Sequence, residues 1–175
     1  MRRLMLLRHA KSDWSVSGQT DHQRGLALRG ETAAPLMGRY MASQALVPDQ
    51  AIVSTAVRTR ETLRLVAEAF PQKPPASYEE RIYEAEPEAI LAAIAKAPSS
   101  AKTLLIVGHN PGLHETAMLL VGSGDKRARA KLSAKFPTAA LAVIDFDVKS
   151  WSAIGPGSGR LERFVTPRAI GGEDD

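Results

Sequence analysis

The chain has 175 residues, of which 44% are hydrophobic and 24% charged, and its formal net charge is +4. This size fits one domain, and we expect a single domain over residues 1–170 followed by a disordered tail over 171–175. The chain contains no cysteine, which excludes disulfide bonds, cysteine catalysis and thiolate metal sites. Basic residues are mostly dispersed and aromatic residues are few, so nucleic-acid binding is not favoured.

The N-terminal run MRRLMLL resembles the start of a signal peptide, but its apolar part is short, and Arg8 and Lys11 follow at once. No stretch approaches the ~18 apolar residues of a membrane-spanning helix. We therefore expect a cytoplasmic, monomeric protein that does not contact membranes.

Short apolar runs that end at polar residues predict strands of a mainly parallel sheet. These strands are expected over residues 4–7, 51–54, 77–79, 103–107, 138–146, 151–154 and 161–165. Apolar residues at helical spacing predict helices over 30–46, 55–70, 87–97 and 113–121. This order indicates a three-layer α/β/α domain, with a mainly parallel central sheet and helices on both faces.

Three features do not follow this pattern of alternating strands and helices. Pro35 conflicts with a helix interior, so the pattern does not define where the first helix begins. Residues 12–28 form a long polar loop after the first strand; such loops are usually functional or disordered, and the position directly after a candidate site favours a functional loop. Residues 122–137 are small, basic and irregular; we interpret the cluster over 126–131 as a solvated helix face or loop, with docking of an acidic partner as the alternative.

Unusual polar residues follow three of the predicted strands. Arg8 and His9 follow the first, a hydroxyl-rich helix start with Arg58 follows the second, and Gly-His109-Asn110 follows the third. The carboxyl ends of parallel strands form the binding edge of an α/β sheet. Helix N-termini favour anions, and the arginine fork matches phosphate oxygens. Together these residues predict a site for a phosphoryl group.

The histidines determine the chemistry that we expect. Two neighbouring arginines bias His9 towards its neutral form, whose free nitrogen is a nucleophile. Metal binding fits poorly, because the arginines would compete with a cation and no H-x-E or paired-carboxylate spacing is present. We therefore expect no metal and no cofactor. His22 and His114 lack such neighbours, and we interpret them as a loop-surface residue and an ordinary helix residue.

The three segments LLRHAKSDW, STAVRTRETL and VGHNPGL resemble the signatures of the histidine phosphatase superfamily, whose members include phosphoglycerate mutases. The similarity is greatest to the SixA-like branch, the phosphohistidine phosphatases, and it covers about residues 2–165. The resemblance implies a phosphoglycerate mutase-like fold. It also implies that His9 is the nucleophile that becomes phosphorylated and that Arg8 and Arg58 bind the phosphoryl oxygens. His109 would be the second histidine, which hydrogen-bonds the phosphate and stabilises charge in the transition state.

Other positions extend or depart from the family pattern. Arg24 lies in DHQRGLALRG, which resembles the D-x-x-R-P-L-x-x-x-G pattern of the branch and implies a further phosphate contact; a solvated loop arginine is the alternative. Asn110 is included among the substrate-binding residues because it follows His109. Ala10 replaces the usual glycine of the first motif, and Gly25 stands where the branch usually has proline.

A phosphate ester also needs a proton donor for its leaving alkoxide. The segment RIYE, which ends at Glu84, resembles the arrangement in larger relatives, so Glu84 is the candidate; an exposed glutamate without a role is the alternative. A phosphoramidate such as phosphohistidine needs this acid less, because its leaving nitrogen can already be protonated.

The interval between Arg58 and His109 is short, which leaves little room for a lid over the site. A mutase must shelter its phosphoenzyme from water, so the short interval argues against a mutase. We expect a metal-independent phosphatase of SixA type that acts on phosphohistidine of a phosphorelay protein. The alternatives are a phosphatase of small phosphate esters that uses Glu84 as general acid, and an inactive phosphate-binding protein.

Overall fold

The computed structural model describes all of residues 1–175 and contains a seven-stranded sheet in the order β3-β2-β4-β1-β6-β7-β5. The strands are β1 (Arg2–Arg8), β2 (Gln50–Ser54), β3 (Ala76–Glu79), β4 (Thr103–Gly108), β5 (Val121–Gly124), β6 (Leu141–Phe146) and β7 (Gly159–Val165). Strands β1 to β4 are parallel, whereas β6 is antiparallel to both of its neighbours, β1 and β7. The predicted fold, with a mainly parallel central sheet, is confirmed.

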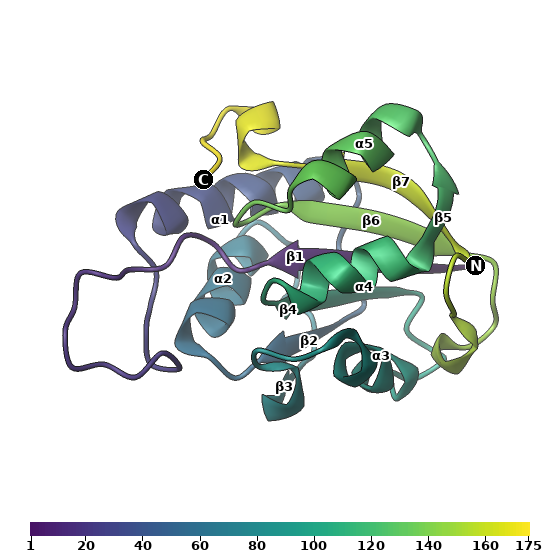
Figure 1. The fold of residues 1–175 in the computed structure, drawn as a ribbon, viewed down its shortest axis with the longest axis horizontal. Helices are drawn as coiled ribbons and strands as arrows, with labels where there is room; N and C mark the ends of the chain where they lie inside the picture. Colours follow the sequence, from purple (N-terminus) through teal and green to yellow (C-terminus); the bar gives the residue numbers. More distant parts are fainter.

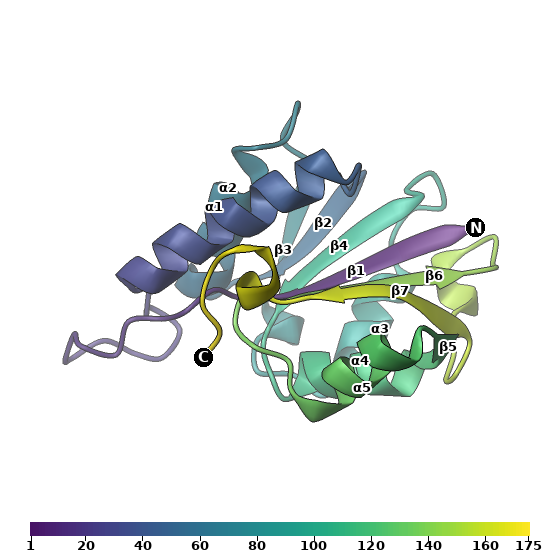
Figure 2. The same ribbon diagram turned by 90° about the horizontal axis from the view of Figure 1, so that it is seen from above.

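Helices cover both faces of this sheet (Figures 1 and 2). Helices α1 (Leu28–Ser43) and α2 (Val57–Ala67) lie on one face; α3 (Pro87–Ala95), α4 (Gly112–Leu120) and α5 (Lys126–Ala134) lie on the other. Short 3₁₀ turns are η1 (Glu80–Ile82), η2 (Trp151–Ala153) and η3 (Pro167–Ile170).

Strand β1 contributes side chains to the hydrophobic cores on both faces of the sheet. Leu4 and Leu6 belong to the core under α3, α4 and α5, and Met5 and Leu7 belong to the core under α1 and α2. Successive side chains of a strand point to opposite faces. Burial on both faces explains why this strand is a continuous apolar run.

The structure differs from some local predictions. Residues 126–134 form helix α5 within a stretch that we expected to be irregular; Asp125 caps its start by accepting the N–H of Ala128 (2.9 Å), and Leu132 is buried in the core. The basic cluster over 126–131 lies mainly on the exposed face of this helix, as the interpretation of a solvated helix face predicted. The expected strand over 151–154 is the 3₁₀ turn η2. Helix α1 begins at Leu28, so Pro35 lies inside it and costs one backbone hydrogen bond.

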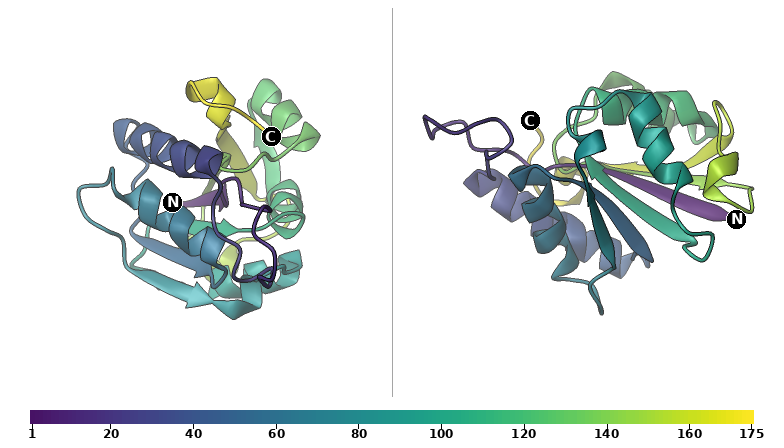
Figure 3. Two further views of the ribbon diagram at one scale, coloured as in Figure 1. Left: turned by 90° about the vertical axis from the view of Figure 1, so that its left-hand side faces the viewer. Right: turned by 90° about the horizontal axis from the view of Figure 1, so that it is seen from below.

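The register of the strands aligns the ends of β1, β4 and β2. Arg8 pairs with Gly108, and Val53 pairs with Val107, so all three strands end at the same edge of the sheet. The long loop after β1 projects beyond this edge, and the C-terminal segment lies on the same side of the molecule (Figure 3).

Residues 171–175, which we expected to be disordered, make defined contacts in the structure. Gly172 donates its N–H to the carbonyl of Pro167 (2.7 Å), and Glu173 forms an ion pair with Arg29. The segment is therefore held against η3 and α1.

No helix in the structure is both long and apolar enough to span a membrane.

Candidate active site

The end of β1 holds His9 in one tautomer. The side chain is buried, and its Nδ1 lies 2.7 Å from the carbonyl oxygen of Ala10. Because a carbonyl only accepts hydrogen bonds, Nδ1 carries the proton and Nε2 keeps its lone pair. Burial, together with the positive charges of the nearby arginines, lowers the pKa of His9 to about 3. At neutral pH this imidazole is therefore uncharged and presents a nucleophilic nitrogen.

The end of β4 places His109 beside His9, with 5.3 Å between the ring centroids. Its Nε2 lies 2.7 Å from Oγ of Ser54, and that oxygen accepts the N–H of Ala56 (3.4 Å). The Ser54 hydroxyl can therefore donate to Nε2, and in that arrangement the proton of the neutral His109 ring is on Nδ1, which faces the Glu84 carboxylate at 3.9 Å. Burial, and then the neighbouring His9 and Arg58, lower the pKa of His109 to about 3.

Two buried arginines of the site share the carboxylate of Asp21. Arg58, in the first turn of α2, has only 2% of its side chain exposed, and its Nη2 donates to Asp21 Oδ2 (3.0 Å). Arg24 donates to Asp21 Oδ1 and to Oγ of Ser12, and its guanidinium stacks 3.5 Å from the ring centroid of Trp14. The alternative of a solvated loop arginine at position 24 is therefore wrong.

Arg8 and Asn110 share one hydrogen-bond acceptor. Arg8 Nη1 and Asn110 Nδ2 both donate to the carbonyl oxygen of Phe136, at 3.1 and 2.9 Å. Arg8 also lies 3.8 Å from a carboxylate oxygen of Asp175. The loop that follows α5 thus holds two of the predicted substrate-binding residues by one carbonyl.

Buried polar atoms without partners gather in this site. Such atoms are Nε of Arg8, Nε of Arg58, Nδ1 of His109 and Oδ1 of Asn110. An unpaired buried polar group costs about 1–3 kcal/mol, and the arginine and His109 atoms are N–H donors. All four residues line a cavity of about 310 Å³ that also includes His9, Arg24 and Glu84. A tetrahedral oxyanion is the kind of ligand that would accept from these donors.

The predicted proton donor Glu84 also faces this cavity. Its Oε1 lies 2.9 Å from Nη2 of Arg58 and 3.9 Å from Nδ1 of His109. Its backbone has φ +52°, a left-handed conformation that is uncommon for non-glycine residues. The structure thus brings together all seven residues that the sequence indicated, and their catalytic roles stay predictions.

Three residues of the site were missed by the sequence analysis. Asp21 had a signal, because it is the first residue of the D-x-x-R pattern that drew attention to Arg24. Ser54 precedes the helix start of the second motif. Asp175 had no signal, since it lies at the opposite end of the chain from Arg8.

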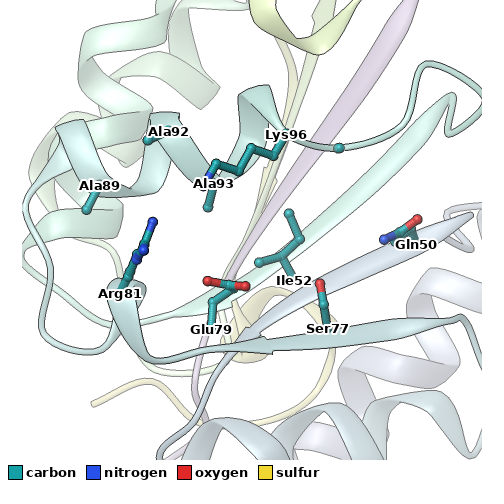
Figure 4. Close-up of a pocket in the computed structure, with 10 residues that line it drawn as sticks. Gln50, Ile52, Ser77, Glu79, Arg81, Ala89, Ala92, Ala93 and Lys96 are labelled. Carbon is teal, nitrogen blue, oxygen red and sulfur yellow. The ribbon is translucent and has the colours of Figure 1, made fainter.

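Another hollow, of about 130 Å³, lies between α3 and the edge formed by β2 and β3 (Figure 4). Its walls are alanines of α3, and its polar side chains include Glu79, Arg81 and Lys96. Acidic and basic groups are mixed there and no histidine is present, so it lacks both the anion preference and the nucleophile of the first cavity.

Comparison with known proteins agrees with this geometry. Residues 4–89 match the model of the histidine phosphatase superfamily (branch 1). An uncharacterized protein of Mycobacterium tuberculosis is 35% identical over 164 residues, which cover 93% of this chain and 100% of that protein. The crystal structure of the putative phosphohistidine phosphatase SixA from Agrobacterium tumefaciens is 32% identical, with a TM-score of 0.80 and coverage of 95% of this chain and 98% of that one.

A putative phosphohistidine phosphatase SixA from Nakamurella is 28% identical, with a TM-score of 0.83 and coverage of 95% and 96%. The chain therefore belongs to the histidine phosphatase superfamily and has its phosphoglycerate mutase-like fold. Within that superfamily it is a member of the SixA-like branch.

Proposed function

We propose that this phosphatase hydrolyses phosphohistidine on a phosphorelay protein, through a phosphorylated His9 and without a metal or other cofactor. One observation carries the proposal: the 2.7 Å hydrogen bond from Nδ1 of His9 to the carbonyl of Ala10. This bond leaves Nε2 without a proton, and His9 lines the same cavity as Arg8, Arg24 and Arg58, as a nucleophile for a phosphoryl group requires.

The reaction has two displacements at phosphorus. In the first, Nε2 of His9 forms a bond to phosphorus while the bond from phosphorus to the substrate imidazole breaks, and the leaving imidazole departs with the proton that it already carries. In the second, water attacks phosphorus, the bond to Nε2 breaks, and inorganic phosphate leaves. Arg8, Arg58 and the Nδ1–H of His109 stabilise the negative oxygens in both transition states.

Two features of the site support a protein as the substrate. The chain between α2 and β4 forms only β3, η1 and α3, so no added element covers the cavity. Trp14 and Val16, in the loop beside the cavity, are 73% and 52% exposed. Apolar side chains around a polar site provide contact area for a protein surface.

The test compares the wild type with His9→Asn, and uses His114→Asn as the matched control outside the cavity. Each protein is given a histidine-phosphorylated phosphotransfer domain, and release of phosphate is measured. We expect turnover and an acid-labile phosphoenzyme in the wild type and in His114→Asn, and neither in His9→Asn. Turnover that survives in His9→Asn would contradict the proposal.

Hydrolysis of small phosphate esters is a second candidate, favoured by the position of Glu84. Its carboxylate lies at the open side of the cavity, with 49% of the side chain exposed, close to both Arg58 and His109. A group in this position can deliver a proton to a departing alkoxide. The two candidates therefore differ in whether turnover depends on a proton donor.

A further inference from the structure

Asp21 lies at the centre of the cationic cluster and is not among the residues to which the family resemblance assigns a role. Its Oδ1 accepts from Nη2 of Arg24, and its Oδ2 accepts from Nη2 of Arg58 (3.0 Å) and from the hydroxyl of Tyr83. Its main-chain carbonyl accepts from Nη1 of Arg58 (2.7 Å). One residue thus accepts four hydrogen bonds from side chains, three of them from arginine.

These partners come from separate parts of the chain. Arg24 lies in the loop after β1, Arg58 in the first turn of α2, and Tyr83 directly after η1. The loop is also tied to α2 because the N–H of Val57 donates to the carbonyl of His22 (3.0 Å). Asp21 therefore connects three segments that meet only in the folded protein.

The charges explain why an acidic residue is needed here. Arg24 and Arg58 are both buried, with 8% and 2% exposure, and two like charges that share a small site repel each other. A buried charge needs a paired and hydrogen-bonded counter-ion. Asp21 contacts both guanidinium groups, whereas Glu84 contacts only Arg58.

The carboxylate stays ionised while it does this. Burial alone would raise the pKa of Asp21, but the hydrogen bonds from Tyr83, Arg24 and Arg58 outweigh it and lower the pKa below its ordinary value. An ionised carboxylate neither donates a proton nor attracts a phosphoryl oxygen. A favourable effect of Asp21 on an anionic ligand therefore has to pass through the arginines that it holds.

We propose that Asp21 is a positioning residue that fixes Arg24 and Arg58 in the orientation that binds a phosphoryl group at His9. This proposal depends on the proposed function in one respect: both take the ligand of the site to be a phosphoryl group. The hydroxyl of Tyr83 holds the Asp21 carboxylate in this orientation.

The experiment measures binding of inorganic phosphate by calorimetry and turnover of the phosphorylated phosphotransfer domain. Asp21→Asn keeps the shape and removes the charge. Asp13→Asn is the matched control, because Asp13 lies in the same loop and its side chain bonds only to Ser15. We expect the dissociation constant for phosphate to rise about 10-fold and kcat/KM to fall roughly 10- to 100-fold in Asp21→Asn, with no change in Asp13→Asn.

Further variants separate positioning from a loss of folding. Asp21→Glu keeps the charge and should recover part of the phosphate affinity. Tyr83→Phe keeps the ring beside His109 but removes the hydrogen bond, and should weaken phosphate binding less than Asp21→Asn does. Because Tyr83 acts through Asp21, the double variant should match Asp21→Asn alone. Additive effects of the two substitutions would overturn the proposal.

The outcomes also separate this proposal from the proposed function. An equal phosphate affinity in the wild type and in Asp21→Asn overturns the role of Asp21, whatever the turnover. Weaker phosphate binding in Asp21→Asn than in the wild type supports the role of Asp21. If the wild type also releases no phosphate from any phosphoprotein, the proposed function is contradicted while the role of Asp21 stands. A wild type that binds no phosphate overturns both.

Discussion

At the scale of single residues, the two facing histidines are buried without charge. The pKa values of His9 and His109 are both about 3 in the folded protein, against an ordinary value of about 6.5. Between these values the unfolded chain binds more protons than the folded one, so the free energy of unfolding falls as the pH falls below 6.5. The chemistry of the site therefore costs stability in acid.

This cost can be measured by urea unfolding at pH 6 and pH 5. Each histidine contributes up to about 1.4 kcal/mol per pH unit. We expect His9→Asn to reduce the loss of unfolding free energy between these two pH values by about 1 kcal/mol, and a double variant with His109→Asn to reduce it further. An unchanged slope would show that the histidines are not held neutral.

Glu84 distinguishes the two candidate reactions at the same scale. We expect Glu84→Gln to lower kcat for an aryl or alkyl phosphate ester about 100-fold and to leave phosphohistidine hydrolysis within about threefold, since only the ester has a leaving group that needs a proton. The matched control is Glu86→Gln, two residues away and exposed. Equal effects on both substrates, or none on either, would contradict the assignment of Glu84 as proton donor.

At the scale of secondary-structure elements, close backbone contacts hold the site segments in place. A Cβ atom on Gly30, at the start of α1, would lie 2.2 Å from the carbonyl oxygen of Lys11, which lies two residues after His9. A Cβ on Gly112, at the start of α4, would lie 1.9 Å from the carbonyl oxygen of Ala85, which follows Glu84. Both glycines therefore allow helices to approach segments that carry site residues.

The Gly112 contact leads to a test of how Glu84 is positioned. Gly112→Ala must push Ala85 away, so we expect a loss of about 1–3 kcal/mol in unfolding free energy together with reduced ester hydrolysis. Gly155→Ala is the control, because a Cβ there meets nothing within 4 Å. Ester hydrolysis at the wild-type rate in Gly112→Ala would contradict this coupling.

At the scale of the whole molecule, the last residues of the chain reach the first strand. The Asp175 carboxylate accepts the N–H of Thr138 (3.0 Å) and lies 3.8 Å from Arg8. Burial alone would raise the pKa of Asp175, but the Thr138 hydrogen bond and the Arg8 charge lower it. At neutral pH it is therefore an anion beside an arginine that we expect to bind phosphate.

Removing the negative charge of the Asp175 side chain should strengthen the binding of phosphate. We expect Asp175→Asn to lower the dissociation constant for inorganic phosphate roughly 2- to 5-fold, the size of a partly exposed ion pair. Asp174→Asn is the control, since Asp174 accepts the N–H of Arg168 (2.9 Å) instead. Calorimetry checks both variants, and unchanged or weaker phosphate binding in Asp175→Asn would contradict the expected competition.

The central part of the fold and of the site could be predicted because its signals are local. A strand buried on both faces, such as β1, is a continuous apolar run. The ends of β1, β2 and β4 lie at one edge because parallel strands share a direction, which brings Arg8, His9, Arg58 and His109 together. The sequence left helix or loop open for the basic cluster of α5, because its single buried residue, Leu132, leaves no apolar periodicity.

The sequence by itself therefore determined the family, the parallel part of the sheet formed by β1 to β4, and the identity of the residues at the strand ends. The tertiary structure alone decided which tautomer His9 adopts, that Asp21 joins Arg24 to Arg58, and that Asp175 reaches Arg8. The links of Asp21 to Arg58 and of Asp175 to Arg8 join residues far apart in the chain, and the His9–Ala10 hydrogen bond, although local, leaves no periodic pattern in the sequence. Local hydrophobic burial specifies where the strands lie, whereas the charge of the site is balanced only after the loops have packed.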